Sequence, residues 1–147
     1  MNDVSKVVSD GAEFVLNTGS PHIVKFVNDL DEYMVTEEGK EIRNNETYKE
    51  DGINVNFVEI LGPGEIKVRT YERGVEDETL ACGTGVVASA LASSFSMHNN
   101  VHSWLVHARG GDLHVDFKQE GDEHYTNVRL TGPAAESFRG ELLLEMK

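Results

Sequence analysis

The segment from Gly83 to about Met97 constrains the fold most, because its sequence GTGVVASALASSFSM carries no charged side chain and does not alternate polar with apolar residues. Its alanine content favours a helix. The larger apolar residues of that helix are joined on its other sides by the small Ala88 and Ala92, so no face of it suits water. We therefore predict a central hydrophobic helix at about residues 83–97, with a sheet wrapped around it.

Most of the remaining sequence alternates apolar and polar residues in short segments, which is typical of half-buried strands. The clearest such segments are Ile53–Val58, Ile66–Tyr71, Leu113–Phe117 and Tyr125–Leu130. Further strands are expected at Glu13–Asn17, His22–Val27, His102–His107 and Glu141–Met146. Short turns that contain glycine, such as LGPGE and RGGD, separate several of them. The sequence therefore predicts an α+β fold in which a mostly antiparallel β barrel or sheet surrounds the helix.

A second helix is expected between Asp29 and Asn44, where the sequence is polar and amphipathic, although Gly39 should interrupt it. We expect this helix to lie on the surface. The charged stretch from Glu37 to Gly52 fits a solvated surface and loop.

The composition suits a single domain, residues 1–147, with one core. Its formal net charge of -13 would repel nucleic acid and anionic membranes, and no basic patch offsets it. The first residues, MNDVSKVVSD, lack the basic and apolar regions of a signal peptide, and no apolar run is long enough for a membrane helix. We therefore expect a cytoplasmic protein without nucleic-acid or membrane partners.

Cys82, the only cysteine, stands immediately before the expected central helix. The first N–H groups of a helix lack intrahelical partners and the helix dipole is positive there, which favours a thiolate over a thiol. The N–H groups of Gly83, Thr84 and Gly85 would hold a carboxylate or a developing oxyanion beside the sulfur. This pairing suits removal of the proton alpha to a carboxylate, because the negative charge of the carbanion spreads onto the carboxylate oxygens. A packing role for Cys82 is the alternative.

Three charged residues precede the cysteine and strengthen the functional interpretation. Glu72 and Arg73 follow an expected strand and offer a carboxylate for an ammonium group and a planar fork for a carboxylate. Glu78 is expected on the capping side of the helix start, where its charge is favoured.

The residues around Cys82 resemble a known family. The segment YERGVEDETLACGTG is similar to the second cysteine motif of diaminopimelate epimerases, and LNTGSPHIVKFV, from Leu16 to Val27, resembles the Gly-x-Pro-His segment of that family. The segments GINVNFVEI and TGPAAESFRGEL are similar to family segments as well. The resemblance covers nearly the whole chain and implies the diaminopimelate-epimerase-like fold.

The resemblance implies an isomerase of lysine and peptidoglycan-precursor biosynthesis. Such an enzyme interconverts LL- and meso-diaminopimelate with two cysteines on opposite faces of the substrate, without pyridoxal phosphate, metal or another cofactor. One cysteine removes the alpha proton as a thiolate while the other donates a proton as a thiol. Carried onto this sequence, the resemblance implies catalytic roles for Cys82, His22 and Glu72. It implies substrate contacts by Ser20, Asn54, Glu72, Arg73, Cys82, Gly83 and Thr84.

His22 keeps an alternative as a structural histidine after a proline. Ser20 stands where many family members carry an asparagine thought to contact the substrate, so that contact is shortened, mediated by water or absent. Val75, Glu76 and Asp77 make this loop one residue longer than the common pattern, and we expect the added acidity to face solvent.

The other cysteine of the family belongs to a Cys-Gly-Asn-Gly-type motif in a preceding domain, and this sequence lacks that motif. We therefore expect the chain to correspond to the C-terminal domain, either excised or naturally truncated, with the N-terminal half as its missing partner. Because racemisation by two bases needs an acid and a base on opposite faces, this chain alone should be inactive. The exposed half of the cleft offers a surface for homodimerisation.

Two other functions stay open from the sequence. A proline-racemase-like isomerase would share the Cys-Gly-Thr-Gly core, and a non-catalytic module would use the helix start only to bind a carboxylate. No metal site is expected, because the spacing of the histidines does not match a ligand set. These histidines are His98, His102, His107 and His114.

Overall fold

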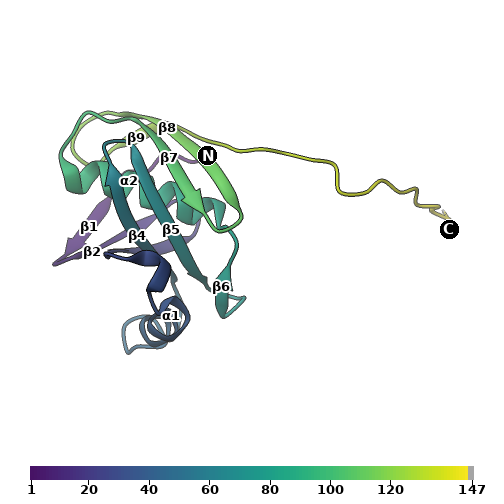
Figure 1. The fold of residues 1–147 in the computed structure, drawn as a ribbon, viewed down its shortest axis with the longest axis horizontal. Helices are drawn as coiled ribbons and strands as arrows, with labels where there is room; N and C mark the ends of the chain where they lie inside the picture. The colour runs from purple at the N-terminus through teal and green to yellow at the C-terminus, as the bar shows by residue number, and fades with distance from the viewer. Residues whose placement is uncertain (146–147) are drawn as a thin grey trace.

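The structure of the chain, a computed structural model, describes residues 1–145. Within that range nine strands form one curled sheet (Figure 1). The strands are β1 (Val7–Asp10), β2 (Glu13–Asn17), β3 (Pro21–Phe26), β4 (Asn54–Gly62), β5 (Glu65–Glu72), β6 (Asp77–Thr79), β7 (Ser103–Ala108), β8 (Gly111–Gln119) and β9 (Tyr125–Thr131). Their order is β1-β2-β3-β4-β5-β7-β8-β9, and β6 pairs with β5.

The pairings of this sheet are antiparallel except for β3 with β4 and β5 with β7, which are parallel. The sheet curls until the start of the chain reaches β9. The Val4 N–H donates to the Tyr125 carbonyl at 2.9 Å, and the Tyr125 N–H donates to the Val4 carbonyl at 2.8 Å. The predicted α+β fold with a mostly antiparallel, curled sheet is therefore confirmed.

The helix α2 (Gly83–Met97) lies inside the curl, with the bounds that the uncharged sequence predicted. Every residue from Gly85 to Ser94 is buried. Its serine hydroxyls are satisfied by the helix itself, since Ser89 donates to the Gly85 carbonyl at 2.7 Å and Ser93 to the Ser89 carbonyl at 2.8 Å. A helix without a polar face can therefore fill the core without leaving these hydroxyl groups unsatisfied.

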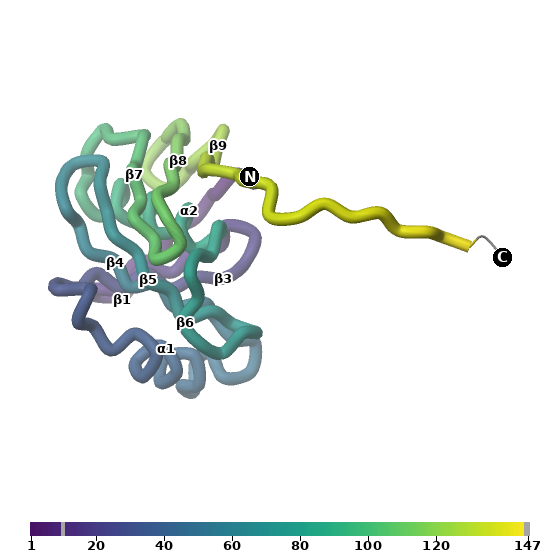
Figure 2. Tube along the Cα trace, turned by 45° about the vertical axis from the view of Figure 1, so that its right-hand side comes forward, coloured from purple at the N-terminus to yellow at the C-terminus, as the bar shows by residue number. Residues whose placement is uncertain are grey.

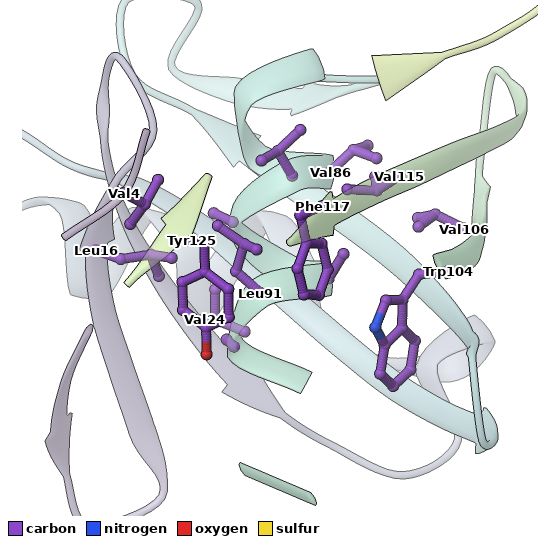
Figure 3. Packing of buried hydrophobic residues seen from close by; sticks show 14 of the residues in the cluster. Val4, Leu16, Val24, Val86, Leu91, Trp104, Val106, Val115, Phe117 and Tyr125 are labelled. Atoms are coloured by element: carbon purple, nitrogen blue, oxygen red, sulfur yellow. The ribbon is translucent and has the colours of Figure 1, made fainter. Parts of the chain in front are cut away.

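The main core forms where α2 meets the inner face of the sheet (Figure 3). Leu91 projects from the helix among strand residues, and the fully buried ring of Trp104 closes one end of the cluster. Phe117 and Tyr125 pack edge to face with ring centroids 5.3 Å apart. This core fixes the position of α2 and therefore of the residues at its start.

A smaller core lies on the outer face of β3, β4 and β5, beneath the 3-10 turn η1 (Leu30–Glu32) and the helix α1 (Val35–Arg43). Figure 2 shows α1 and α2 on opposite sides of β4 and β5. The sequence predicted one helix over residues 29–44 with an interruption at Gly39, and that interruption is wrong. Gly39 is buried inside α1 where the helix packs against the sheet, and a Cβ there would overlap the Tyr71 side chain.

Two strand predictions need correction. The alternation in Ile53–Val58 indicated a half-buried strand, but Asn54 and Asn56 in β4 are buried along with their apolar neighbours. Hydrogen bonds to neighbouring residues satisfy both amides, and the Asn56 amide lies against Gly85 at the start of α2. The predicted strand at Glu141–Met146 is absent over residues 141–145, and Met146 lies outside the described residues.

Residues 132–145 instead run away from the domain as an extended segment without a strand beside it (Figure 1). An apolar segment alone cannot make a strand, because its backbone needs a neighbouring strand for hydrogen bonding. Two elements were not predicted: the short strands β1 and β6, whose residues have little alternation to mark them. None of the helices in residues 1–145 combines the length and apolar character needed to cross a membrane.

Candidate functional site

Cys82 occupies the N-cap position of α2, in extended backbone conformation, and its side chain is partly exposed. The Val86 N–H donates to the Cys82 carbonyl at 2.8 Å as the first hydrogen bond of the helix. The N–H groups of Gly83, Thr84 and Gly85 precede that bond and have no carbonyl of the helix to pair with. The sulfur therefore lies beside the positive end of the helix dipole, as predicted from the sequence.

An open pocket of about 730 Å³ lies in front of this turn. Predicted site residues Glu72, Cys82, Gly83 and Thr84 contribute to its wall. The lining also includes the first residue of the chain and part of β9, which the sequence did not predict: Met1, Val128, Arg129, Leu130 and Thr131. The chain start reaches this place because the Met1 amino group donates to the Val128 carbonyl at 3.0 Å.

Behind the pocket, Thr84 and His22 are joined. The Thr84 hydroxyl lies 2.9 Å from Nε2 of His22 and 3.6 Å from Sγ of Cys82. His22 is fully buried, and burial together with the nearby positive charge of Arg73 lowers its pKa from 6.5 to about 4. The imidazole is therefore neutral at physiological pH.

Asn56 and Thr70 continue this polar cluster on the inner face of the sheet. The Asn56 side-chain nitrogen lies 3.0 Å from Nδ1 of His22 and donates to the Ile23 carbonyl at 3.1 Å. The Thr70 hydroxyl donates to Oδ1 of Asn56 at 2.9 Å. The sequence reasoning missed both residues, although Asn56 follows Asn54 by two positions and must share its face of the strand.

Ser20, Asn54 and Arg73 form a second group at the edge of the site. The Asn54 side-chain amide donates to the Ser20 hydroxyl at 2.9 Å, and its oxygen accepts from the backbone N–H of Arg73 at 2.8 Å. The Arg73 guanidinium donates to the Asp51 carbonyl at 2.9 Å and to the Ser20 hydroxyl at 3.4 Å. The structure therefore brings together residues that are far apart in the sequence, at the end of β5 and the start of β3.

Glu78 does not lie at the helix start, and that expectation is wrong. It belongs to β6, where Arg69 binds both carboxylate oxygens at 2.7 and 2.8 Å and Arg109 lies at 3.2 Å. Burial alone would raise the pKa of Glu78, but these two guanidinium groups lower it overall. Glu78 therefore joins β6 to β5. Its largely buried carboxylate is stabilised more by hydrogen bonds from guanidinium groups than it would be by a helix end.

The longer connection from β5 into the start of β6 faces solvent, as predicted. Val75, Glu76 and Asp77 are all exposed, and the carboxylate of Glu76 pairs with Arg43 at 3.2 Å. Among residues 1–145, no three His, Cys, Asp or Glu side chains are grouped so that they could hold a metal ion. His107 instead lies between two carboxylates, with Nε2 2.8 Å from Glu65 and Nδ1 2.7 Å from Asp112.

Comparison with known proteins shows the family to which the chain belongs. The family model described as diaminopimelate epimerase matches residues 14–135. The chain belongs to the diaminopimelate epimerase family. The diaminopimelate epimerase of Flavobacterium psychrophilum is 43% identical over 134 residues, 91% of this chain and 52% of the relative. That of Chlorobaculum tepidum is 48% identical over 132 residues, 88% of this chain and 49% of the relative.

The chain thus spans about half the length of the curated relatives that it matches. Solved structures share the fold at low sequence identity. A predicted epimerase from Pseudomonas aeruginosa has a TM-score of 0.55 at 15% identity, over 72% of this chain and 35% of that one. A probable proline racemase from Agrobacterium radiobacter has a TM-score of 0.52 at 14% identity, over 92% of this chain and 51% of that one. The racemase likeness is one of fold, whereas the sequence matches favour diaminopimelate epimerases over the alternatives.

Proposed function

We propose that this chain supplies one half of a two-base epimerase site for diaminopimelate, with Cys82 as its acid or base. The observation that supports it best is the position of the Cys82 sulfur, which borders an open pocket beside the unpaired N–H groups at the start of α2. A thiolate and an anion-binding turn are the two groups that abstraction of a proton alpha to a carboxylate requires.

In the proposed reaction, the N–H groups of Gly83, Thr84 and Gly85 hold the carboxylate next to the reacting carbon. The Cys82 thiolate takes the alpha proton, the C–H bond breaks, and its electron pair spreads into the held carboxylate. A second acid on the opposite face returns a proton to carbon, which inverts the centre. No cofactor enters these steps, because the thiolate moves the proton and the N–H groups stabilise the charge.

The charged residues at the end of β5 are proposed to bind the ends of the substrate. Glu72 lines the pocket and would accept from the ammonium group, and Arg73 would bind the distal carboxylate. Both amide atoms of Asn54 already hold Ser20 and Arg73. We therefore assign Asn54 the task of keeping Ser20 and Arg73 in place for the substrate.

The second acid is proposed to come from a complementary domain. The sequence has one cysteine, and both ring nitrogens of His22 are engaged by Asn56 and Thr84 rather than turned into the pocket. A two-base inversion therefore lacks its second group within residues 1–145. This accords with the chain matching about half of each curated relative.

Exchange of the alpha hydrogen in D₂O tests the proposal. The lone chain should neither epimerise diaminopimelate nor exchange its alpha hydrogen, and addition of the other half of the family protein should start both reactions. Cys82→Ser should abolish them in the mixture, while Ser103→Ala, a change on an exposed strand residue away from the pocket, should not. Turnover by the lone chain would overturn the two-domain proposal.

Binding can be followed without turnover. Diaminopimelate should shift the amide resonances of Gly83, Thr84 and Gly85 in the lone chain, and lysine, which lacks the distal carboxylate, should bind more weakly. Equal shifts with both compounds would remove the proposed role of Arg73.

A further inference from the structure

The Cys82 sulfur is the outer end of a line of polar side chains that continues into the core. From Sγ the line passes to the Thr84 hydroxyl at 3.6 Å, to Nε2 of His22 at 2.9 Å, and from Nδ1 to the Asn56 amide at 3.0 Å. Its inner members, His22 and Asn56, have no solvent exposure. Water therefore cannot substitute for a wrongly directed hydrogen bond, and the direction of each bond matters.

The inner end of the line fixes the orientation of the Asn56 amide. The Ile23 carbonyl can only accept, so the atom of Asn56 that faces it at 3.1 Å must be the nitrogen. The Thr70 hydroxyl donates to the other amide atom, the oxygen, at 2.9 Å. The same amide nitrogen then donates its second hydrogen to Nδ1 of His22, which must be unprotonated to accept it.

A neutral imidazole has one N–H, so an accepting Nδ1 places the hydrogen on Nε2. That N–H donates to the Thr84 oxygen. The Thr84 hydroxyl hydrogen is then directed away from His22, and the other hydrogen-bond partner of this hydroxyl is the Cys82 sulfur. The low pKa of His22, about 4, keeps the ring in this neutral form over the range in which a thiol titrates.

Gly85 permits the close approach that this line needs. A Cβ at residue 85 would overlap Oδ1 of Asn56 and would lie 3.3 Å from Cε1 of His22. The Cys-Gly-Thr-Gly turn therefore uses its second glycine to seat α2 against the polar cluster.

We propose that Asn56 is a positioning residue that fixes the Nε2–H tautomer of His22, so that the Thr84 hydroxyl donates its hydrogen bond to the Cys82 thiolate. His22 acts through Thr84 in this arrangement and does not itself take a proton from the substrate. The use made of the thiolate rests on the proposed function, whereas the direction of the hydrogen bonds is a property of the folded chain.

The tautomer is tested directly by nitrogen NMR of the chain labelled at histidine. Nε2 of His22 should carry the hydrogen, and Nδ1 should be unprotonated, between about pH 5 and pH 8. Asn56→Asp presents only acceptors to the ring and should move a hydrogen onto Nδ1. A hydrogen on Nδ1 in the unaltered chain, or an unprotonated Nδ1 in Asn56→Asp, would overturn the proposal.

The link to the sulfur is tested by the rate at which iodoacetamide alkylates Cys82. Thr84→Val removes the hydroxyl and should slow alkylation at about pH 7 by about tenfold, the effect of one hydrogen bond to a charged group. Thr84→Ser keeps the hydroxyl and should stay within about twofold of the unaltered chain. Equal rates in the valine and serine variants would overturn the proposal.

Asn56→Leu should slow alkylation in the same direction, and the double variant Asn56→Leu/Thr84→Val should be no slower than Thr84→Val alone, because the two residues act in series. Additive losses would show that Asn56 acts on Cys82 by another route. These readouts do not depend on epimerase activity. An inactive mixture with the expected tautomer and alkylation rates would count against the proposed function only.

Discussion

The strands β3, β4 and β5 bury residues on both of their faces, but the two buried sets are chemically different. On the outer face, the residues buried beneath α1 are apolar: Ile23, Val55, Phe57 and Tyr71. The inner face, near the start of α2, carries a buried polar set: His22, Asn54, Asn56 and Thr70. Burial therefore does not by itself select apolar side chains in this sheet.

The difference between the faces lies in how each contributes to stability. The outer face removes apolar surface from water, which stabilises the fold in proportion to area. The inner face loses the hydration of its polar groups and regains hydrogen bonds of similar strength, so its net contribution is small. We infer that the outer face and the core around α2 hold the domain together, while the inner polar set is retained for the site.

The largest expected effect in this comparison is the loss of stability at acid pH. The unfolded chain takes up a proton on His22 below about pH 6.5, whereas the folded chain does so only near a pKa of about 4. The free energy of unfolding should therefore fall as the pH drops from 6.5 to 4, by about 3 kcal/mol from this residue. Urea denaturation over this range, compared with His22→Gln, isolates the contribution. If His22 in the folded chain titrates with a pKa near 6.5, this prediction loses its basis.

Gly39→Ala should have the next largest effect, through the outer face. The added Cβ overlaps the Tyr71 side chain at its Cβ, which cannot rotate away. We expect the free energy of unfolding to fall by about 2 kcal/mol in total. The overlap therefore outweighs the roughly 1 kcal/mol by which alanine is favoured over glycine in a helix. Chemical denaturation measures it, and alkylation of Cys82 in the folded protein should be unchanged. A more stable variant would show that α1 can move off the sheet freely.

Thr70→Val tests the inner face with a smaller change. Valine has nearly the same shape but leaves Oδ1 of Asn56 without its donor, so we expect a loss of about 1 kcal/mol. The nitrogen NMR spectrum of His22 should also report a less firmly held ring. If stability is unchanged, the Thr70 hydrogen bond contributes nothing and the inner face tolerates an unpaired oxygen.

Tyr71→Phe, at the neighbouring position, should have the smallest effect. The ring lies in the outer core while its hydroxyl reaches Glu76 at 3.3 Å near the surface. Removing that hydroxyl should cost no more than about 0.5 kcal/mol, and the signals of His22 should not move. Because Thr70 and Tyr71 are adjacent in sequence, a larger loss in Tyr71→Phe than in Thr70→Val would reverse the comparison.

The two faces also explain how far the sequence could predict the structure. The bounds of α2 and β2 follow from local patterns, a long uncharged run and a short apolar run, and both were predicted as the structure has them. Cys82 and its turn were predicted because a helix start has the same chemistry in any fold. The resemblance placed Glu72, Gly83 and Thr84 in the site, and the structure lines one pocket with them.

What the sequence could not predict depends on contacts between distant segments. The alternation in β4 is the same whether Asn54 and Asn56 face water or the interior of the protein, so their burial was missed. The partner of Glu78 is Arg69 across a turn, which no helix-capping pattern reveals. The segment 141–145 is apolar like a strand but has no neighbouring strand in residues 1–145.

The two parallel pairings have a consequence for how the chain folds. Antiparallel neighbours such as β7 and β8 close a short turn, whereas β3 with β4 and β5 with β7 each require a long crossover, the second of which contains α2. Long loops close slowly. His22 and Asn56 meet across the first crossover and Thr84 belongs to the second, so we expect the surroundings of Cys82 to become native late in refolding. The reactivity of the Cys82 sulfur would then report when the whole sheet has formed.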